Sequence, residues 1–112
     1  MSVKKSEIKV MVSLDENNLP IEMSWTASDA GVNNEPCKAI VLALWNEKEQ
    51  NTLRMDLWNK DMKVDEMKMF FHQTLLTLAD IFGKATGEKN ICEDLRDYCF
   101  HFAEKMNIQP QQ

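Results

Sequence analysis

The spacing of the apolar residues changes along the chain, and this change constrains the fold more than any other feature of the sequence. Within residues 7–14, 21–27 and 52–58 apolar side chains recur at every second position. Within residues 64–85 and 89–106 they recur three and four positions apart. A period of two is typical of a half-buried strand, and the longer period is typical of an amphipathic helix. The chain is therefore predicted to be an α+β protein.

The first two alternating runs predict a β-hairpin. In residues 7–14 Ile8 and Val10 belong to one face and Met11 to the other, while Trp25 belongs to the inward face of residues 21–27. Asn and Asp in the intervening segment favour a turn. We expect Trp25 to pack on the long helix near Phe71 and Leu75.

The segment between the hairpin and the third strand is predicted to form a short buried helix. Proline at position 36 suits a first helical turn, and the run Ala39–Trp45 is apolar throughout. In residues 52–58, Leu57 points inward and Trp58 outward. A right-handed crossover favours strand order 2-1-3. The prediction is a small three-stranded, antiparallel-dominated sheet (β-β-α-β-α-α) covered on one face by helices.

The last two periodic segments predict a helix pair. The first apolar stripe is unusually wide, so it either packs on both sides within the chain or forms a dimer interface. Gly83 and Gly87 are predicted to terminate the first helix. The two stripes contain Met67, Phe70, Phe71, Leu75, Leu78, Ala79 and Phe82, and then Ile91, Cys92, Leu95, Tyr98, Cys99, Phe102, Ala103 and Met106.

Length and composition predict one domain over residues 1–112, with an ordered core at 6–106 and a frayed tail at 107–112. The longest apolar run has seven residues, whereas a membrane span needs about 20. No signal peptide is visible, so we expect a cytoplasmic protein without membrane insertion. With 18 acidic and 13 basic residues the net charge is −5, which argues against nucleic acid and weakly favours a soluble partner of basic character.

The sequence shows no pattern of catalytic, cofactor-binding or metal-binding residues, and we expect no enzyme activity and no cofactor. Gly83-Lys84-Ala85-Thr86 superficially resembles a phosphate loop, but it follows a predicted helix rather than a strand. An odd number of cysteines without a Cys-x-x-Cys motif predicts reduced, buried thiols at Cys37, Cys92 and Cys99.

A few apolar residues fall on faces predicted to be polar, and they mark the candidate partner site. Trp58 and Met11 lie among charged residues on the outer face of the sheet, and Phe100 lies on the polar side of the last helix. An exposed Trp with a polar rim is typical of an interface centre. The alternative is that Trp58 folds under the following loop as a core residue. The candidate site comprises Met11, Trp58, Asn59, Lys60, Asp61 and Phe100.

Several strings of the sequence resemble one family. They are Lys5–Ile8, Leu14–Pro20, Thr52–Met62 with Val64–Lys68, and Phe70–Leu75 with Ala79-Asp80. Together they resemble the gliding motility-associated protein GldC family. The resemblance implies a small soluble accessory protein of the Bacteroidetes gliding motility and type IX secretion apparatus, with no enzymatic activity and no catalytic residues.

The first functional hypothesis is a cytoplasmic interaction protein that serves an envelope motility or secretion machine through protein partners, with a homodimer also possible. The alternative is a small acidic chaperone that holds an envelope or secreted client, by adding an extended segment to an open sheet edge. A chaperone should bind extended peptides, whereas an adaptor should bind a folded partner.

Overall fold

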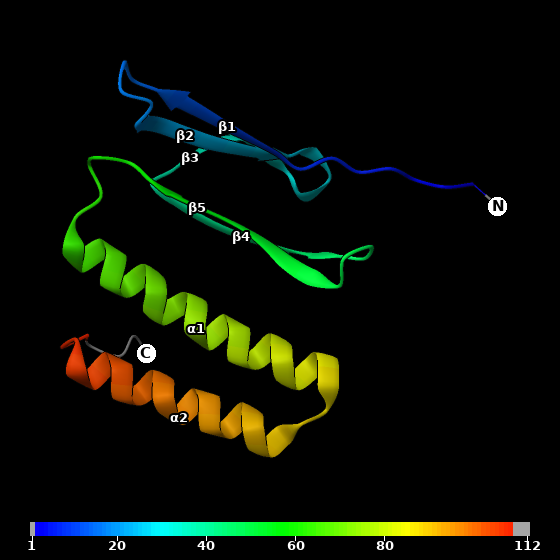
Figure 1. The fold of residues 1–112 in the computed structure, drawn as a ribbon, viewed down its shortest axis with the longest axis vertical. Coiled ribbons are helices and arrows are strands. Elements are labelled where there is room, and N and C mark those ends of the chain that lie inside the picture. The colour runs from blue at the N-terminus through cyan, green and yellow to red at the C-terminus, as the bar shows by residue number, and fades with distance from the viewer. Residues whose placement is uncertain (1, 109–112) are drawn as a thin grey trace. The chain divides into compact units, whose positions relative to one another are not determined.

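Within residues 2–108 the chain folds as an α+β protein with five strands and two long helices (Figure 1). The computed structural model describes residues 2–108, and the end of the predicted tail lies outside them. The chain divides into two compact units, one up to Met62 and one from Lys63 onward. The elements are β1 (Lys9–Leu14), β2 (Pro20–Ala27), a 3-10 turn (Ser28–Ala30), β3 (Val32–Cys37), β4 (Ala39–Asn46), β5 (Asn51–Trp58), α1 (Val64–Thr86) and α2 (Lys89–Lys105).

The predicted N-terminal hairpin is confirmed, and β3 extends it to an antiparallel sheet in the order β1-β2-β3. The turn between β1 and β2 is held by Asp15, whose Oδ1 accepts hydrogen bonds from the backbone N–H groups of Asn17 (2.8 Å) and Leu19 (3.0 Å). Asn18 supplies the left-handed residue of this turn, with φ of 62°. Local turn chemistry therefore sets the register of the hairpin.

The inward face of β2 contains the buried apolar residues of this unit. Met23 and Ala27, both predicted to point inward, are buried, and Trp25 on the same face is 36% exposed. On β1 the predicted outward residue Met11 is more exposed than its neighbour Val10. Both strands are thus confirmed, but the predicted alternation of burial is confirmed only in part, because Ile8, Leu14 and Ile21 were also predicted to point inward and are exposed. The predicted packing of Trp25 on the long helix stays a prediction.

The helix predicted for residues 36–45 is wrong, because this segment forms the end of β3 and all but the last residue of β4. Pro36 lies in β3, which is an edge strand of its sheet and tolerates a missing N–H. The run Ala39–Trp45 has the length of a strand, and its β-branched and aromatic residues favour extended backbone. Because polar and apolar residues do not alternate in this run, the sequence pattern did not predict a strand here.

Strand β5 coincides with the third predicted strand, but the predicted order 2-1-3 is wrong. β5 pairs with β4 in a separate two-stranded antiparallel ribbon, and β1 pairs with β2 alone. In the turn of the ribbon, Asn46 Oδ1 accepts hydrogen bonds from the N–H groups of Lys48 and Glu49, both at 3.1 Å. The described part of the chain therefore has five strands followed by two helices, and the covering of a sheet by helices stays a prediction.

The two predicted helices are confirmed within one residue of their expected ends. At the start of α1 the Glu66 carboxylate accepts a hydrogen bond from the backbone N–H of Lys63 at 3.0 Å. Gly87, with φ of 74°, ends α1 by donating its N–H to the carbonyl of Gly83. Gly83 itself lies inside the helix, so its predicted role as a terminator is wrong.

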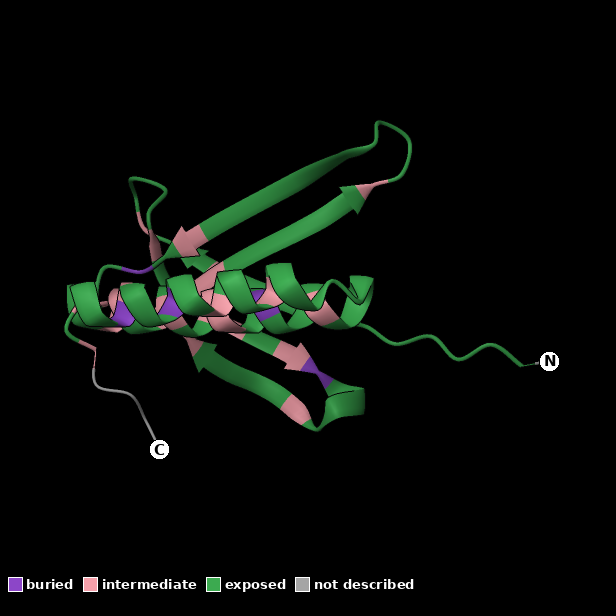
Figure 2. Cartoon of the chain, turned by 90° about the horizontal axis from the view of Figure 1, so that it is seen from below, coloured by how far each residue is buried: buried purple, intermediate pink, exposed green. Residues whose placement is uncertain are grey.

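Small side chains fill the seam between α1 and α2. Ala79, Cys99 and Ala103 are buried there, and a Cβ added at Gly83 would come within 2.8 Å of Cys92 Sγ. The Cys92 thiol donates a hydrogen bond to the carbonyl of Ala79 (3.1 Å). Figure 2 shows that buried positions are few and that most of the chain is exposed. Many of the larger apolar side chains of the two helices therefore lie outside this seam and are exposed.

Candidate partner-binding surface

The β4–β5 ribbon presents two faces of different composition. Across the ribbon Ile40 pairs with Leu57, Leu42 with Met55 and Leu44 with Leu53, so these six residues share one side, the aliphatic face. The opposite side, the tryptophan face, consists of Ala39, Val41, Ala43, Trp45, Thr52, Arg54, Asp56 and Trp58. The predicted outward set of the third strand, Arg54, Asp56 and Trp58, therefore shares one face as expected.

Two exposed tryptophans lie at the two ends of the tryptophan face. Trp58 pairs with Ala39 at one end and is 56% exposed, and Trp45 pairs with Thr52 at the other end and is 67% exposed. The charged side chains of Arg54 and Asp56 lie between them along β5. The alternative in which Trp58 folds under the loop as a core residue does not fit its exposure. Trp and Arg are the residues most enriched at the centres of protein interfaces.

Sequence reasoning missed Trp45, because it placed this residue in a buried helix. A usable signal was present in the segment itself. Odd positions from Ala39 to Trp45 lie on the same side as Trp58, and the seven-residue length suits a strand better than a helix.

The residues after β5 connect the ribbon with the first sheet. The backbone N–H of Asn59 donates to the carbonyl of Lys38 (3.0 Å), and its side-chain Oδ1 accepts from the N–H of Asp61 (3.1 Å). Asn59 is buried, and these bonds give its backbone N–H and its Oδ1 a partner. The predicted polar loop is therefore partly structural.

Lys60 is tied to the β1–β2 turn. Its Nζ lies 2.6 Å from Oδ2 of Asp15. The Lys60 ammonium, helped by the backbone N–H of Leu19, lowers the pKa of Asp15 to about 2. Lys60, the cation of the predicted site, is therefore already paired with Asp15 of the same chain.

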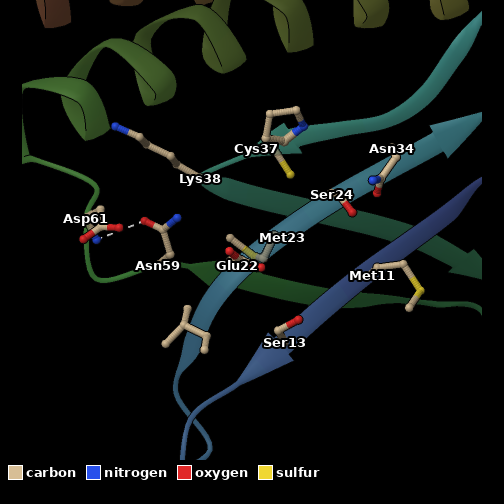
Figure 3. A pocket seen from close by; sticks show the side chains of 12 residues that line it. Met11, Ser13, Glu22, Met23, Ser24, Asn34, Cys37, Lys38, Asn59 and Asp61 are labelled. Atoms are coloured by element: carbon tan, nitrogen blue, oxygen red, sulfur yellow. Dashed lines mark hydrogen bonds between the residues drawn. The ribbon is translucent and has the colours of Figure 1, made fainter.

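An open pocket of about 600 Å³ brings three predicted site residues together (Figure 3). Met11 comes from β1, and Asn59 and Asp61 come from the segment after β5. Both apolar and polar residues line the pocket, which suits a contact that is apolar in part and hydrogen-bonded in part. The other lining residues are Ser13, Ile21, Glu22, Met23, Ser24, Asn34, Pro36, Cys37 and Lys38.

Three of the predicted residues, Trp58, Lys60 and Phe100, do not line this pocket. Trp58 belongs to the tryptophan face of the ribbon, and Phe100 belongs to α2 in the second unit, where it is 59% exposed. The six predicted residues therefore do not form one continuous site. Met11, Asn59 and Asp61 gather at the pocket, and Lys60 is occupied by Asp15.

The thiols are consistent with inert, packed cysteines. Cys99 is buried and Cys37 and Cys92 are partly buried, and none of the three is in a disulfide. Burial raises the pKa of the Cys37 and Cys99 thiols, which lowers the fraction of reactive thiolate at neutral pH. Among residues 2–108 no group of three or more His, Cys, Asp or Glu side chains is placed to hold a metal ion.

These features define a small α+β protein with an aromatic surface on a two-stranded ribbon and a mixed pocket beside it. The chain belongs to the GldC-like family, described as gliding motility-associated protein GldC-like, which matches residues 20–108. The match contains the strings at 52–62 and 64–80 that resembled this family, whereas the similar residues 5–19 lie outside it. No curated protein and no solved structure matches the chain. In the part that the structure describes, neither helix is both long and apolar enough to cross a bilayer.

Proposed function

We propose that the chain is a non-enzymatic accessory protein that binds a protein partner of a gliding motility and type IX secretion machine. The observation that supports this proposal best is the pair of exposed tryptophans, Trp45 and Trp58, on one face of the ribbon. Membership in a gliding motility-associated family supplies the process. We also propose a cytoplasmic location, without membrane insertion.

The proposed contact has an aromatic centre and a polar edge. Trp58 provides a large apolar anchor, and Arg54 and Asp56 on the same face can pair with charges of either sign. Met11, Asn59 and Asp61 at the adjoining pocket would extend the contact, with Lys60 holding the loop through Asp15. Phe100 stays a separate proposed contact on α2.

The test is capture of the partner from native cells by the purified chain, followed by a binding titration. Trp58→Ala should leave the circular dichroism spectrum unchanged and weaken binding by roughly 30-fold, because a truncated anchor commonly costs about 2 kcal/mol. Trp45→Ala should also weaken binding of the partner. Leu53→Ala is the matched control, since Leu53 is half-exposed on the same strand but lies on the aliphatic face.

Equal capture by wild type and by both tryptophan variants would contradict the proposed site. A Trp58→Ala chain that unfolds would instead identify Trp58 as a core residue. Loss of binding in Leu53→Ala alone would move the site to the aliphatic face.

A chaperone for an envelope or secreted client is the second candidate, and strand β4 supplies the observation that favours it. β4 carries no charged residue, and among residues 2–108 neither β4 nor β5 pairs with a third strand. An uncharged open edge is suited to an added extended segment. A chaperone should bind unrelated unfolded peptides with similar affinities, whereas the accessory protein should bind one folded partner and ignore them.

A further inference from the structure

The helix hairpin has two lateral sides that differ in charge. Successive residues of a helix are rotated by about 100°, so positions around α1 and α2 can be placed relative to the buried seam residues Ala79 and Cys99. Asp80 and Arg96 form an ion pair across the two helices, and this pair marks one side of the hairpin. A residue lies on the opposite side of the hairpin when its rotation about the helix axis, measured from Ala79 or Cys99, is in the direction away from Asp80 or Arg96.

On α1 the opposite side is apolar. Phe71, Leu78 and Phe82 are rotated from Ala79 by about 60–100° away from Asp80. On α2, Ile91, Leu95 and Tyr98 are rotated from Cys99 by about 40–100° away from Arg96. α1 and α2 are consecutive helices that lie side by side and are joined by Gly87-Glu88 (Figure 1). Because both sets are rotated away from the Asp80–Arg96 pair, they lie on the same side of the hairpin. We name these six residues the hairpin face.

The hairpin face is large, exposed and uncharged. Its six side chains are between 36% and 56% exposed. With side chains of this size the exposed apolar area is about 500 Å², near the upper end of the largest patch on an ordinary monomer. None of the six residues carries a charge at neutral pH. Such a surface implies an apolar cover.

The other side of the helix hairpin is not suited to packing against an apolar surface. Phe100 is as exposed as Tyr98, at 59% against 56%, but Glu93, Asp97 and Glu104 are placed around it on α2. Arg96 on this side is paired with Asp80, so the three carboxylates around Phe100 leave the side acidic, and two copies of it would repel each other. Only the uncharged side can meet its own copy without that repulsion.

We propose that the hairpin face packs against the hairpin face of a second copy of this chain. An isologous pairing brings the same patch together from both copies and closes as a dimer. Two antiparallel helix pairs that meet through apolar sides make a four-helix arrangement, a common way to bury such stripes. About 500 Å² of apolar area, with its polar edge, approaches the roughly 800 Å² per partner of a standard interface. Because the hairpin face has no charged residue, it cannot form ion pairs with a charged partner.

The experiment measures the mass of the purified full chain by sedimentation over about a hundredfold range of concentration, so that mass action reveals self-association. The wild type should change from monomer to dimer as concentration rises. Tyr98→Glu and Leu78→Glu, one on each helix of the face, should each weaken the dimer at least roughly tenfold, because each buries a charge in the interface. Phe100→Glu is the matched control, equally exposed on the same helix, and should dimerise like the wild type.

A wild-type chain that stays monomeric throughout would overturn the proposal. Dimers of unchanged affinity in both face variants would overturn it, and so would a Phe100→Glu chain that dissociates as readily as Tyr98→Glu. Circular dichroism identifies a variant that has lost its helices, and the other face variant then decides the outcome. Trp58→Ala should dimerise normally, so a failed partner site and a failed dimer are separate results.

Discussion

The β1-β2-β3 sheet and the β4–β5 ribbon are joined by one residue, Lys38, yet they differ in what they bury. The sheet buries Met23 and Ala27 on one face of its central strand, whereas the described part of the ribbon has no buried residue. A third strand and a turn fixed by Asp15 make the sheet the more self-sufficient structure. A two-stranded ribbon with apolar residues on both faces depends on contacts beyond its own strands. The difference suggests that the sheet serves as scaffold and the ribbon as contact surface.

The largest expected effect compares a tryptophan of the sheet with one of the ribbon. Trp25→Ala should lower the free energy of unfolding by about 2–3 kcal/mol, somewhat less than for a fully buried aromatic, because Trp25 is partly exposed. Trp45→Ala should cost less than about 1 kcal/mol. Urea denaturation measures both. Equal losses would show that the ribbon is as buried as the sheet.

The second prediction extends the comparison to the helix hairpin with one identical substitution at two sites. Ala79→Leu overfills the buried seam and should lower the free energy of unfolding by about 1–3 kcal/mol. Ala43→Leu, on the exposed tryptophan face, should change it by less than about 0.5 kcal/mol. Thermal unfolding of both variants provides the measurement. A destabilising Ala43→Leu would place another part of the molecule over this face.

The third prediction sharpens the comparison through the cysteines. Cys99, buried in the hairpin seam, should react with a thiol reagent more slowly than Cys37, which lies at the end of β3 and is only partly buried. Both should react more slowly in the native than in the unfolded chain, because burial raises their pKa and restricts access. Mass spectrometry of timed labelling reports each site. Fast labelling of Cys99 would mean that the seam opens readily.

The smallest effect concerns the tie between the β1–β2 turn and the segment after β5. The pKa of Asp15 is about 2 in the folded chain and 3.8 when unperturbed, so its ionisation stabilises the fold above about pH 4. This contribution is lost as the pH falls from about 4 to 2. Lys60→Ala should raise the pKa of Asp15 toward its ordinary value in an NMR titration. Lys48→Ala, in the ribbon turn, should leave that pKa unchanged.

Local patterns predicted most of the strands and both helices, because their apolar spacing is regular and their turns carry Asn, Asp and Gly. The prediction for Ala39–Trp45 was wrong because the residues of this segment are apolar on both faces. The alternation that identifies a strand is therefore missing. Trp58 was assigned to the correct side, since alternation in β5 is intact. Met11, Asn59 and Asp61 were predicted to share one site because the third strand was expected beside the first in a single sheet. In the structure their meeting at one pocket has another cause, since β1 and β5 belong to different sheets. This meeting depends on the break between two sheets and on bonds such as that from Asn59 to the Lys38 carbonyl.

Each described strand or helix pairs with its immediate neighbour in the chain, and this simple connectivity has a kinetic consequence. β1 pairs with β2, β2 with β3, β4 with β5 and α1 with α2, so little chain has to be closed to form any pairing. Folds rich in local contacts form fast. During synthesis the uncharged strand β4 waits for only the residues up to Trp58, about one to a few seconds at ordinary translation rates, before β5 pairs with it. This uncharged strand therefore waits only briefly for β5, which pairs with one of its two edges.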